Sequence, residues 1–213
     1  MNKNNKKRII VFASGSGTNF INIYKNLNTQ NINGEIILLI SNNKNCGAIK
    51  FAKDENIDFK IINIFRYKTD ENILNKYKVL LDIYKPDLIL LAGFMKKIPI
   101  EIVEMYKNKI LNIHPSLLPK YGGKGFYGMN VHRAVLESKD RITGVTVHFI
   151  DNEYDRGPIL IQEKVEVRPN DSLESLSNRV LQTEYQVYFK AVELFCNNLI
   201  RIKGDKIFIN EKN

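Results

Sequence analysis

Uninterrupted apolar strand patterns, each followed by a helix-like stretch, are the feature that most restricts how this sequence can fold. Residues 8–13 and 87–92 each contain only apolar residues after the first position. Such runs are typical of central strands in a parallel sheet, where helices cover both faces. Helical patterns separate the strand patterns throughout the first half, and this alternation predicts a doubly wound, Rossmann-like α/β fold.

The second half of the chain follows a different pattern. Residues 143–150 and 159–167 are longer runs rich in β-branched residues, which predict a hairpin or another antiparallel addition. A capping signal at residues 171–174 predicts a long helix to about residue 198, and a short strand is expected at residues 206–209. We therefore expect a mostly parallel, twisted sheet with helices on both faces and an antiparallel C-terminal addition.

The length of 213 residues and the hydrophobic content of 44% suit one domain with a substantial core. We expect a single domain over residues 1–213. It would comprise a basic N-terminal tail (1–7), a nucleotide-binding-like half (8–113), and a half with the catalytic loop, hairpin and C-terminal helix (114–213).

The sequence contains no run of about 18 uncharged apolar residues, and its N-terminus leads directly into a strand pattern. We therefore expect a cytoplasmic protein that does not bind membranes. Cys46 and Cys196 lie far apart in the sequence, and neither has the spacing of a metal ligand. We expect neither a disulfide nor a bound metal.

The net charge of +9 does not by itself indicate a nucleic-acid partner. Lys outnumbers Arg by 24 to 8, and Ile (29) and Asn (26) are also abundant, as expected of AT-rich codons. A protein that reads nucleic acid through its grooves would favour Arg. The positive charge would instead attract an anionic small substrate.

A glycine-rich turn at Ser14–Asn19 joins the first strand pattern to a helical one. Backbone N–H groups at such a helix N-terminus favour an anion, so a phosphate could bind at Gly17, Thr18 and Asn19. A turn without a ligand remains the alternative. Phe20 replaces the third glycine of a dinucleotide site, and no acidic residue follows the second strand, so a monophosphate fits better than a dinucleotide.

Chemically versatile side chains gather between Asn112 and Asp155, a segment that contains all three histidines. Asn112 and His114 are two positions apart on a strand, so both side chains point to the same side. Together they could bind a developing oxyanion and move a proton, although a structural role for the pair remains open. Ser14–Asn19, Met95–Ile98 and Asn112–His114 each lie at the carboxyl end of a predicted parallel strand. Ligands of doubly wound sheets bind beyond these ends.

Three further features concern this segment. Asp155 lies on a predicted turn, where it would either shape the backbone or favour the imidazolium of His114. We expect a surface or capping role for His132 and a packed or supporting role for His148. Four glycines within residues 122–128 predict a mobile loop beside the site.

The sequence resembles the phosphoribosylglycinamide formyltransferase family, the folate-dependent transformylases of purine synthesis. The resemblance covers nearly the whole chain. It rests on Asn-Ile-His-Pro-Ser-Leu-Leu-Pro-Lys-Tyr at residues 112–121, Leu-Ala-Gly-Phe-Met at residues 91–95, and Asp155 with Gly157. The combination of Asn-x-His with a distant Asp is highly specific to folate formyltransferases.

This resemblance implies a single-domain formyltransferase fold and transfer of the formyl group of 10-formyltetrahydrofolate to the amine of phosphoribosylglycinamide, in a monomer or homodimer without a metal. It assigns catalysis to Asn112, His114 and Asp155. It assigns the ribonucleotide to Gly17, Thr18, Asn19 and Glu184. The implied folate site comprises Met95, Lys96, Lys97, Ile98, Asn112, Asp151, Asn152, Glu153, Tyr154 and Asp155.

Some positions depart from the family pattern. The Glu-His-Pro segment near the end of such chains reads Glu184-Tyr185-Gln186 here. An arginine common before the fourth strand has no clear equivalent, with Arg66 and Lys68 nearby. The glycine loop is longer than usual.

Other functions are weighed against this one. A methionyl-tRNA formyltransferase would need Arg-Gly after Leu-Leu-Pro and a further C-terminal domain. A formyltetrahydrofolate hydrolase would usually carry an extra N-terminal domain. Another folate-dependent formyltransferase or a formyltetrahydrofolate hydrolase remains as the alternative. A non-catalytic basic RNA-binding protein is a more distant one, recognisable by salt-sensitive RNA binding.

Overall fold

The computed structural model describes residues 6–30, 32–204 and 206–210. Most of the predicted basic tail, residues 1–5, therefore lies outside the described residues. The chain divides into two compact units, Met1–Leu111 and Asn112–Asn213. The prediction of a single domain stays a prediction, and the units are described in turn.

The first unit contains four parallel strands in the order β3-β2-β1-β4. They are β1 (Lys7–Phe12), β2 (Gly34–Ser41), β3 (Phe59–Ile61) and β4 (Leu88–Leu91). The two uninterrupted apolar runs became β1 and β4, which pair with each other; β4 is buried throughout, and β1 is buried from Ile9 onward. The prediction of central parallel strands at these positions is confirmed.

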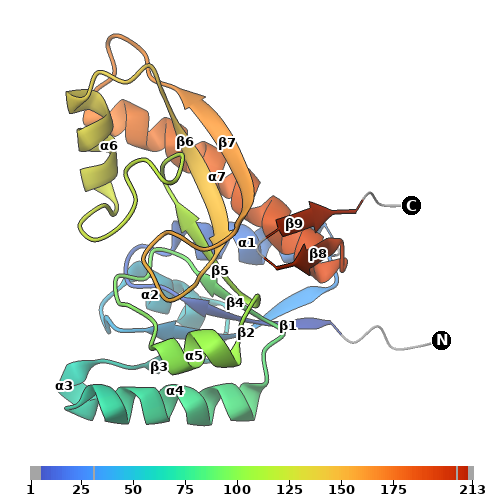
Figure 1. Ribbon diagram of the computed structural model, residues 1–213. Coiled ribbons are helices and arrows are strands. Elements are labelled where there is room, and N and C mark those ends of the chain that lie inside the picture. The colour runs from blue at the N-terminus through green and yellow to red at the C-terminus, as the bar shows by residue number, and fades with distance from the viewer. Residues whose placement is uncertain (1–5, 31, 205, 211–213) are drawn as a thin grey trace. The chain divides into compact units, whose positions relative to one another are not determined.

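Helices cover both faces of this part of the sheet, with α1 and α2 on one face and α4 and α5 on the other (Figure 1). The helices are α1 (Thr18–Thr29), α2 (Gly47–Asp54), α3 (Ile64–Tyr67), α4 (Asp70–Tyr84) and α5 (Ile100–Met105). The hydroxyl of Thr69 accepts a hydrogen bond from the backbone N–H of Asn72 and so begins α4. The short helix α3 was not predicted from the sequence.

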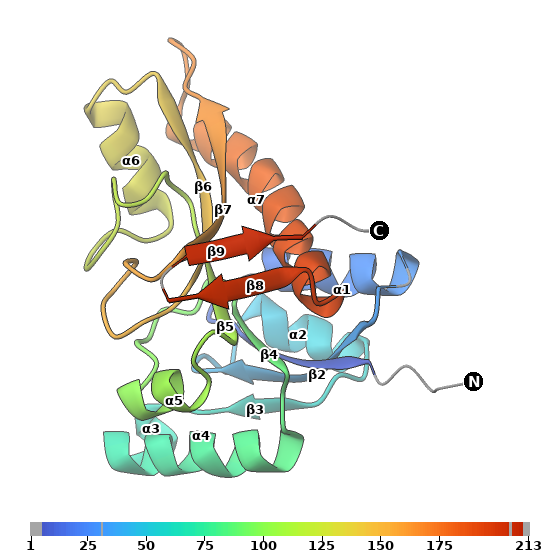
Figure 2. The same ribbon diagram turned by 45° about the vertical axis from the view of Figure 1, so that its right-hand side comes forward.

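Strand β5 (Ile110–His114) crosses the boundary between the units and leads into the second unit. This unit contains α6 (Met129–Glu137), β6 (Ile142–Phe149), β7 (Ile159–Glu166), α7 (Leu173–Cys196), β8 (Ile200–Lys203) and β9 (Lys206–Ile209). Strands β6 and β7 are antiparallel, as predicted, and α7 packs against both. In Figure 2 the β8–β9 hairpin lies at the C-terminal end of α7; only β9 was predicted.

Seven strands form one sheet in the order β3-β2-β1-β4-β5-β6-β7, and β8 and β9 form a separate two-stranded sheet. The predicted α/β fold with an antiparallel C-terminal addition is confirmed. No helix within the described residues is long and apolar enough to span a bilayer.

A buried carboxylate fixes the start of α7. Arg179 binds both oxygens of Asp171 at 2.7 Å, and Ser175 and the backbone N–H of Arg168 also donate to this carboxylate. Ser172 and Ser175 form a reciprocal capping box. The Arg179 guanidinium is the main reason why the pKa of Asp171 lies well below its ordinary value.

We predict that Asp171→Asn lowers the free energy of unfolding at neutral pH and flattens its dependence on pH. Because the folded state has the lower pKa, the stabilisation is present above the unfolded pKa of about 4 and is lost as the pH falls below it. Denaturant titrations from pH 7 to pH 2 would measure this. The exposed Asp54, changed to Asn, is the control. Equal pH slopes in Asp171→Asn and wild-type protein would contradict the prediction.

Candidate active site

The second unit brings Asp155 between two histidines. Asp155 Oδ2 lies 3.6 Å from His114 Nδ1, and Asp155 Oδ1 lies 3.7 Å from His148 Nε2. The Asn112 side-chain nitrogen lies 3.1 Å from the same His148 nitrogen. Strand β5 supplies Asn112 and His114, β6 supplies His148, and the turn between β6 and β7 supplies Asp155.

The turn that carries Asp155 depends on its backbone. Asp155 has a φ of +56°, in the left-handed region that Asp tolerates better than most residues. A side chain at Gly157 would overlap the backbone oxygen of Phe149, so the return of the chain to β7 requires glycine there. The Asp–x–Gly spacing of the sequence is thus explained by the geometry of the turn.

His114 is buried, and both of its ring nitrogens face acceptors. Its Nε2 lies 2.7 Å from the backbone oxygen of Tyr121, which can only accept, so Nε2 carries a proton. Its Nδ1 faces the Asp155 carboxylate. An imidazolium would provide a donor to each of these two acceptors.

The loop after β5 is held by side chains of β6 and β7. The Thr146 hydroxyl donates to the Ser116 backbone oxygen at 2.6 Å and accepts from the Leu118 backbone N–H at 3.1 Å. Gln162 donates to the Leu118 backbone oxygen. Gly144 packs so closely on Leu117 that a side chain there would overlap it. The Pro-Ser-Leu-Leu-Pro segment that follows His114 is therefore held against β6 and β7.

His148 has a supporting position, as predicted, but it lies within the polar cluster. The register with β7 shifts between Val147 and His148, because β7 carries one extra residue, Leu160, at this point. His148 is 1% exposed, and burial lowers its pKa although the Asp155 charge opposes the shift.

The prediction of a surface or capping role for His132 is wrong. His132 lies within α6 on the face that also buries Val131 and Val135, and it is 5% exposed. Burial is the main cause that lowers its pKa to about 4, and the charge of His114 adds to the shift. Polar character predicted exposure here, whereas the helical spacing to Val135 indicated the buried face.

In the first unit, Ser14 joins two predicted site segments. Its hydroxyl accepts from the Met95 backbone N–H at 2.8 Å and donates to the Asn42 side-chain oxygen at 2.6 Å. Its backbone oxygen accepts from the Asn43 side chain. The glycine turn and the start of the Met95–Ile98 segment therefore lie together at the carboxyl ends of β1 and β4.

The glycine turn leads directly into α1. Gly17 has a φ of +77°, and an added Cβ there would lie 2.7 Å from the Cβ of Ala48. Thr18 and Asn19 lie in the first turn of α1, where backbone N–H groups point out of the N-terminal end of a helix. This turn has the backbone geometry of an anion site.

The other predicted contact residues occupy different environments. Met95, Lys96 and Lys97 are exposed, and Ile98 is buried. In the second unit, Asn152, Glu153 and Tyr154 are exposed and Asp151 is half-buried. Glu184 is half-buried on α7.

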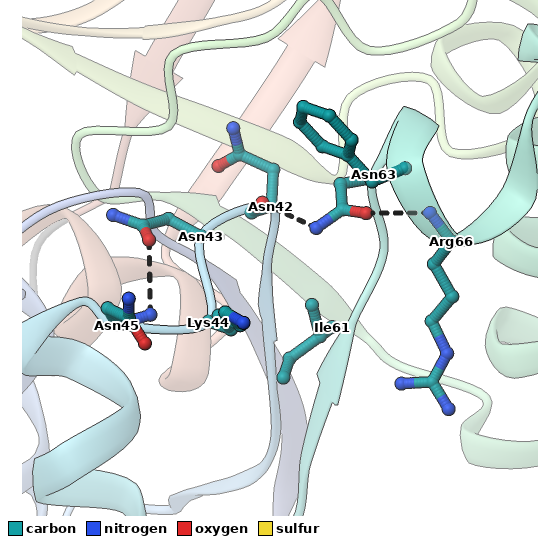
Figure 3. A pocket seen from close by; sticks show the side chains of 8 residues that line it. Asn42, Asn43, Lys44, Asn45, Ile61, Asn63 and Arg66 are labelled. Carbon is teal, nitrogen blue, oxygen red and sulfur yellow. Dashed lines mark hydrogen bonds between the residues drawn. The ribbon is translucent and has the colours of Figure 1, made fainter.

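Sequence reasoning missed a pocket of about 730 Å³ in the first unit (Figure 3). It lies beyond β2 and β3, and two of its side chains are cationic. None of the predicted site residues lines it. The signal for it was the asparagine-rich segment after β2. Its lining residues are Asn42, Asn43, Lys44, Asn45, Ile61, Asn63, Phe65 and Arg66.

The part of the chain that the structure describes contains no group of three or more His, Cys, Asp or Glu residues placed to hold a metal ion. The side chains of Asn112, His114 and His148 can donate hydrogen bonds, and the histidines and the Asp155 carboxylate can transfer protons.

Comparisons with known proteins show the family of this chain. The formyl transferase family model matches residues 7–192. The chain belongs to the formyl transferase family. A chloroplastic phosphoribosylglycinamide formyltransferase of Arabidopsis thaliana is 40% identical over 203 residues, which cover 95% of this chain and 70% of that protein. The phosphoribosylglycinamide formyltransferase of Haemophilus influenzae is 34% identical, covering 97% and 95%.

Among solved structures, the glycinamide ribonucleotide transformylase 1 of Symbiobacterium toebii superposes with a TM-score of 0.89 at 31% identity, covering 97% of this chain and 95% of that one. The resemblance to phosphoribosylglycinamide formyltransferase is confirmed. So are the predicted formyltransferase fold and the prediction of a folate-dependent one-carbon transferase of purine synthesis.

The cluster also predicts the behaviour of the glycine loop. The Gly123 backbone N–H donates to Asp155 Oδ2 at 2.8 Å. We expect Asp155→Ala to speed hydrogen exchange at Gly123 by about tenfold, as expected for the loss of a charge-assisted bond of about 1.5 kcal/mol.

Exchange followed by NMR would measure this, with the amides of β6 as the internal control. The prediction is wrong if Gly123 already exchanges in the wild-type protein as fast as in an unstructured peptide.

Proposed function

We propose that this protein transfers the formyl group of 10-formyltetrahydrofolate to the amine of 5-phosphoribosylglycinamide, with Asn112, His114 and Asp155 as the catalytic residues. The observation that carries the proposal is the placement of His114 Nδ1 3.6 Å from Asp155 Oδ2, with Asn112 two positions before His114 on β5. Because these side chains share one compact unit, their mutual geometry is defined by that unit alone.

In this reaction the glycinamide amine attacks the formyl carbon, and a new C–N bond forms. Negative charge grows on the formyl oxygen, and Asn112 and the His114 imidazolium can donate hydrogen bonds to it. The bond from the formyl carbon to N10 of the folate then breaks. The proton lost by the attacking amine is relayed by His114 to N10, so the proton count balances.

His114 must exchange a hydrogen bond during this sequence. In the resting protein its Nε2–H donates to the Tyr121 backbone oxygen. For this N–H to reach the substrate, the bond to Tyr121 has to be replaced by one to the formyl oxygen. Such rearrangement on substrate binding is common in active sites. The Asp155 carboxylate would hold the ring in place meanwhile.

The substrates are assigned to the predicted segments. The ribonucleotide phosphate would bind the N–H groups of Gly17, Thr18 and Asn19, and Glu184 would accept from the ribose hydroxyls. The folate would contact Met95 to Ile98, Asn112, and Asp151 to Asp155. The hydrogen bonds of Ser14 to Met95 and Asn42 support the assignment of the phosphate to the glycine turn and of the folate to Met95–Ile98, because they hold the glycine turn beside Met95.

The remaining proposals follow the same function. We propose a single formyltransferase domain over residues 1–213, cytoplasmic, without a metal, nucleic-acid or membrane partner, and active as a monomer or homodimer. The excess of positive charge suits two anionic substrates.

The deciding experiment is a formyl-transfer assay with purified protein, 10-formyltetrahydrofolate and phosphoribosylglycinamide. We expect formylated ribonucleotide and tetrahydrofolate in equal amounts. A reaction without the ribonucleotide distinguishes transfer from hydrolysis. Release of formate that does not depend on the ribonucleotide would refute the proposal and favour a hydrolase.

The phosphate assignment predicts the effect of Gly17→Val. The new side chain would overlap Ala48 and strain the positive φ, which displaces the N–H groups of the turn. We expect the KM for the ribonucleotide to rise at least about tenfold, which corresponds to the loss of one hydrogen bond to a charged group. The KM for the folate should change less than about twofold.

Ala48→Gly is the matched partner for this test. Combined with Gly17→Ala, it removes the closest contact and should restore part of the ribonucleotide affinity that Gly17→Ala alone loses. Equal changes in the two KM values would place the phosphate elsewhere.

The catalytic assignment predicts non-additive losses. His114→Ala and Asp155→Asn should each lower kcat by about 10² to 10⁴. Because the carboxylate acts through the imidazole, the double variant should lose little more than the worse single variant. Steady-state kinetics on folded variants would measure this. Asp171→Asn, at the start of α7, is the control and should leave kcat unaltered. Fully additive losses in kcat would show that Asp155 does not act through His114 and only shapes the turn.

A further inference from the structure

We propose that His148 is a positioning residue for formyl transfer: it fixes the side-chain amide of Asn112 so that an N–H, and not the amide oxygen, is presented to the formyl oxygen. This inference rests on the proposed function, because it explains how the donor assigned to Asn112 is held in the required orientation. No substrate contact is assigned to His148 itself.

The protonation of His148 follows from its neighbours. Its Nδ1 lies 3.0 Å from the backbone oxygen of Phe149, an atom that can only accept. A proton must therefore lie on Nδ1, since two lone pairs at this distance would repel each other. The choice that remains is between the neutral ring with a bare Nε2 and the imidazolium with a second proton on Nε2.

Burial selects the neutral ring. The His148 side chain is 1% exposed, and a second positive charge in this cluster would face the same carboxylate that His114 faces. Asp155 can compensate only one imidazolium, and an uncompensated buried charge is costly. Desolvation lowers the pKa of His148 more than Asp155 raises it. His148 Nε2 is therefore a hydrogen-bond acceptor.

An acceptor at Nε2 determines how the Asn112 amide is turned. The Asn112 nitrogen lies 3.1 Å from Nε2, so one of its two hydrogens is used in this bond. The second N–H remains available to the substrate. If the amide were reversed, its oxygen would face the bare Nε2, and the amide orientation near the formyl group would be reversed as well.

The orientation of the Asn112 amide decides whether it stabilises or destabilises the charge that develops on the formyl oxygen. An N–H directed at the formyl oxygen stabilises the negative charge that develops there, whereas an amide oxygen in the same place would repel it. Thr146 and His148 are two positions apart on β6, so their side chains lie on the same face, and Thr146 holds the loop after His114. One face of β6 thus orients two of the three catalytic side chains.

The direct test is the tautomer of His148 in the resting wild-type enzyme. Two-bond ¹⁵N–¹H correlation spectra distinguish the three protonation states of each histidine, and His148→Gln identifies the His148 signals. We expect the neutral form with its proton on Nδ1 at pH 7. A proton on Nε2, alone or in an imidazolium, overturns the proposal. This measurement needs no catalytic activity, so it can fail while formyl transfer itself is demonstrated.

The kinetic test compares two replacements. His148→Leu removes the acceptor, and we expect kcat to fall about 10²-fold, the usual loss for one misplaced oxyanion donor, while both KM values change less than about twofold. His148→Gln places a side-chain oxygen near the position of Nε2, and it should recover most of this loss.

Val147→Ala is the matched control, because Val147 is equally buried on the opposite face of β6. It should lower the melting temperature and leave kcat unaltered. A folded His148→Leu variant with wild-type kcat, or a His148→Gln variant as slow as His148→Leu, would show that His148 is only a packed residue. If His148→Leu does not fold, the tautomer measurement and His148→Gln still decide.

Discussion

The Asp155 carboxylate is the group on which the polar cluster of the second unit depends. It faces His114 with one oxygen and His148 with the other, and the Gly123 N–H donates to it. These contacts come from β5, β6 and the glycine loop, so the carboxylate joins three segments that are separate in sequence. They are possible because Asp155 adopts a positive φ and because Gly157 lets the turn close against Phe149.

Much of the fold could be predicted because burial leaves a strong mark on local sequence. The apolar runs that became β1 and β4 contain no alternation, as expected when both faces are covered. The capping signal at Ser172 gave the start of α7, although Ser175 and not Glu174 completes the capping box. The short elements α3 and β8 were missed because four residues carry too little periodicity to distinguish them from a loop.

The sequence named the candidate residues, whose roles stay predictions, but it did not report how they lie relative to one another. Strand spacing placed Asn112 and His114 on one side, whereas no local pattern reports that Asp155 reaches both His114 and His148. The extra residue Leu160 in β7 shifts the register opposite His148, and no local pattern in β6 reports this shift. His132 was misplaced because its polarity outweighed the helical spacing of its apolar neighbours. The pocket lined by Asn42 and Arg66 gave only a compositional signal.

Two histidines that share one carboxylate need not be equivalent, and their other hydrogen bonds make them different. His114 has an acceptor on each side, the Tyr121 oxygen and Asp155, so a doubly protonated ring satisfies both. His148 has an acceptor at Nδ1 but a donor, the Asn112 amide, at Nε2. A second proton there would displace that donor and bury an uncompensated charge. The backbone oxygen of Phe149 and the amide of Asn112 thus favour the neutral ring of His148. The Asp155 carboxylate is then available to pair with His114.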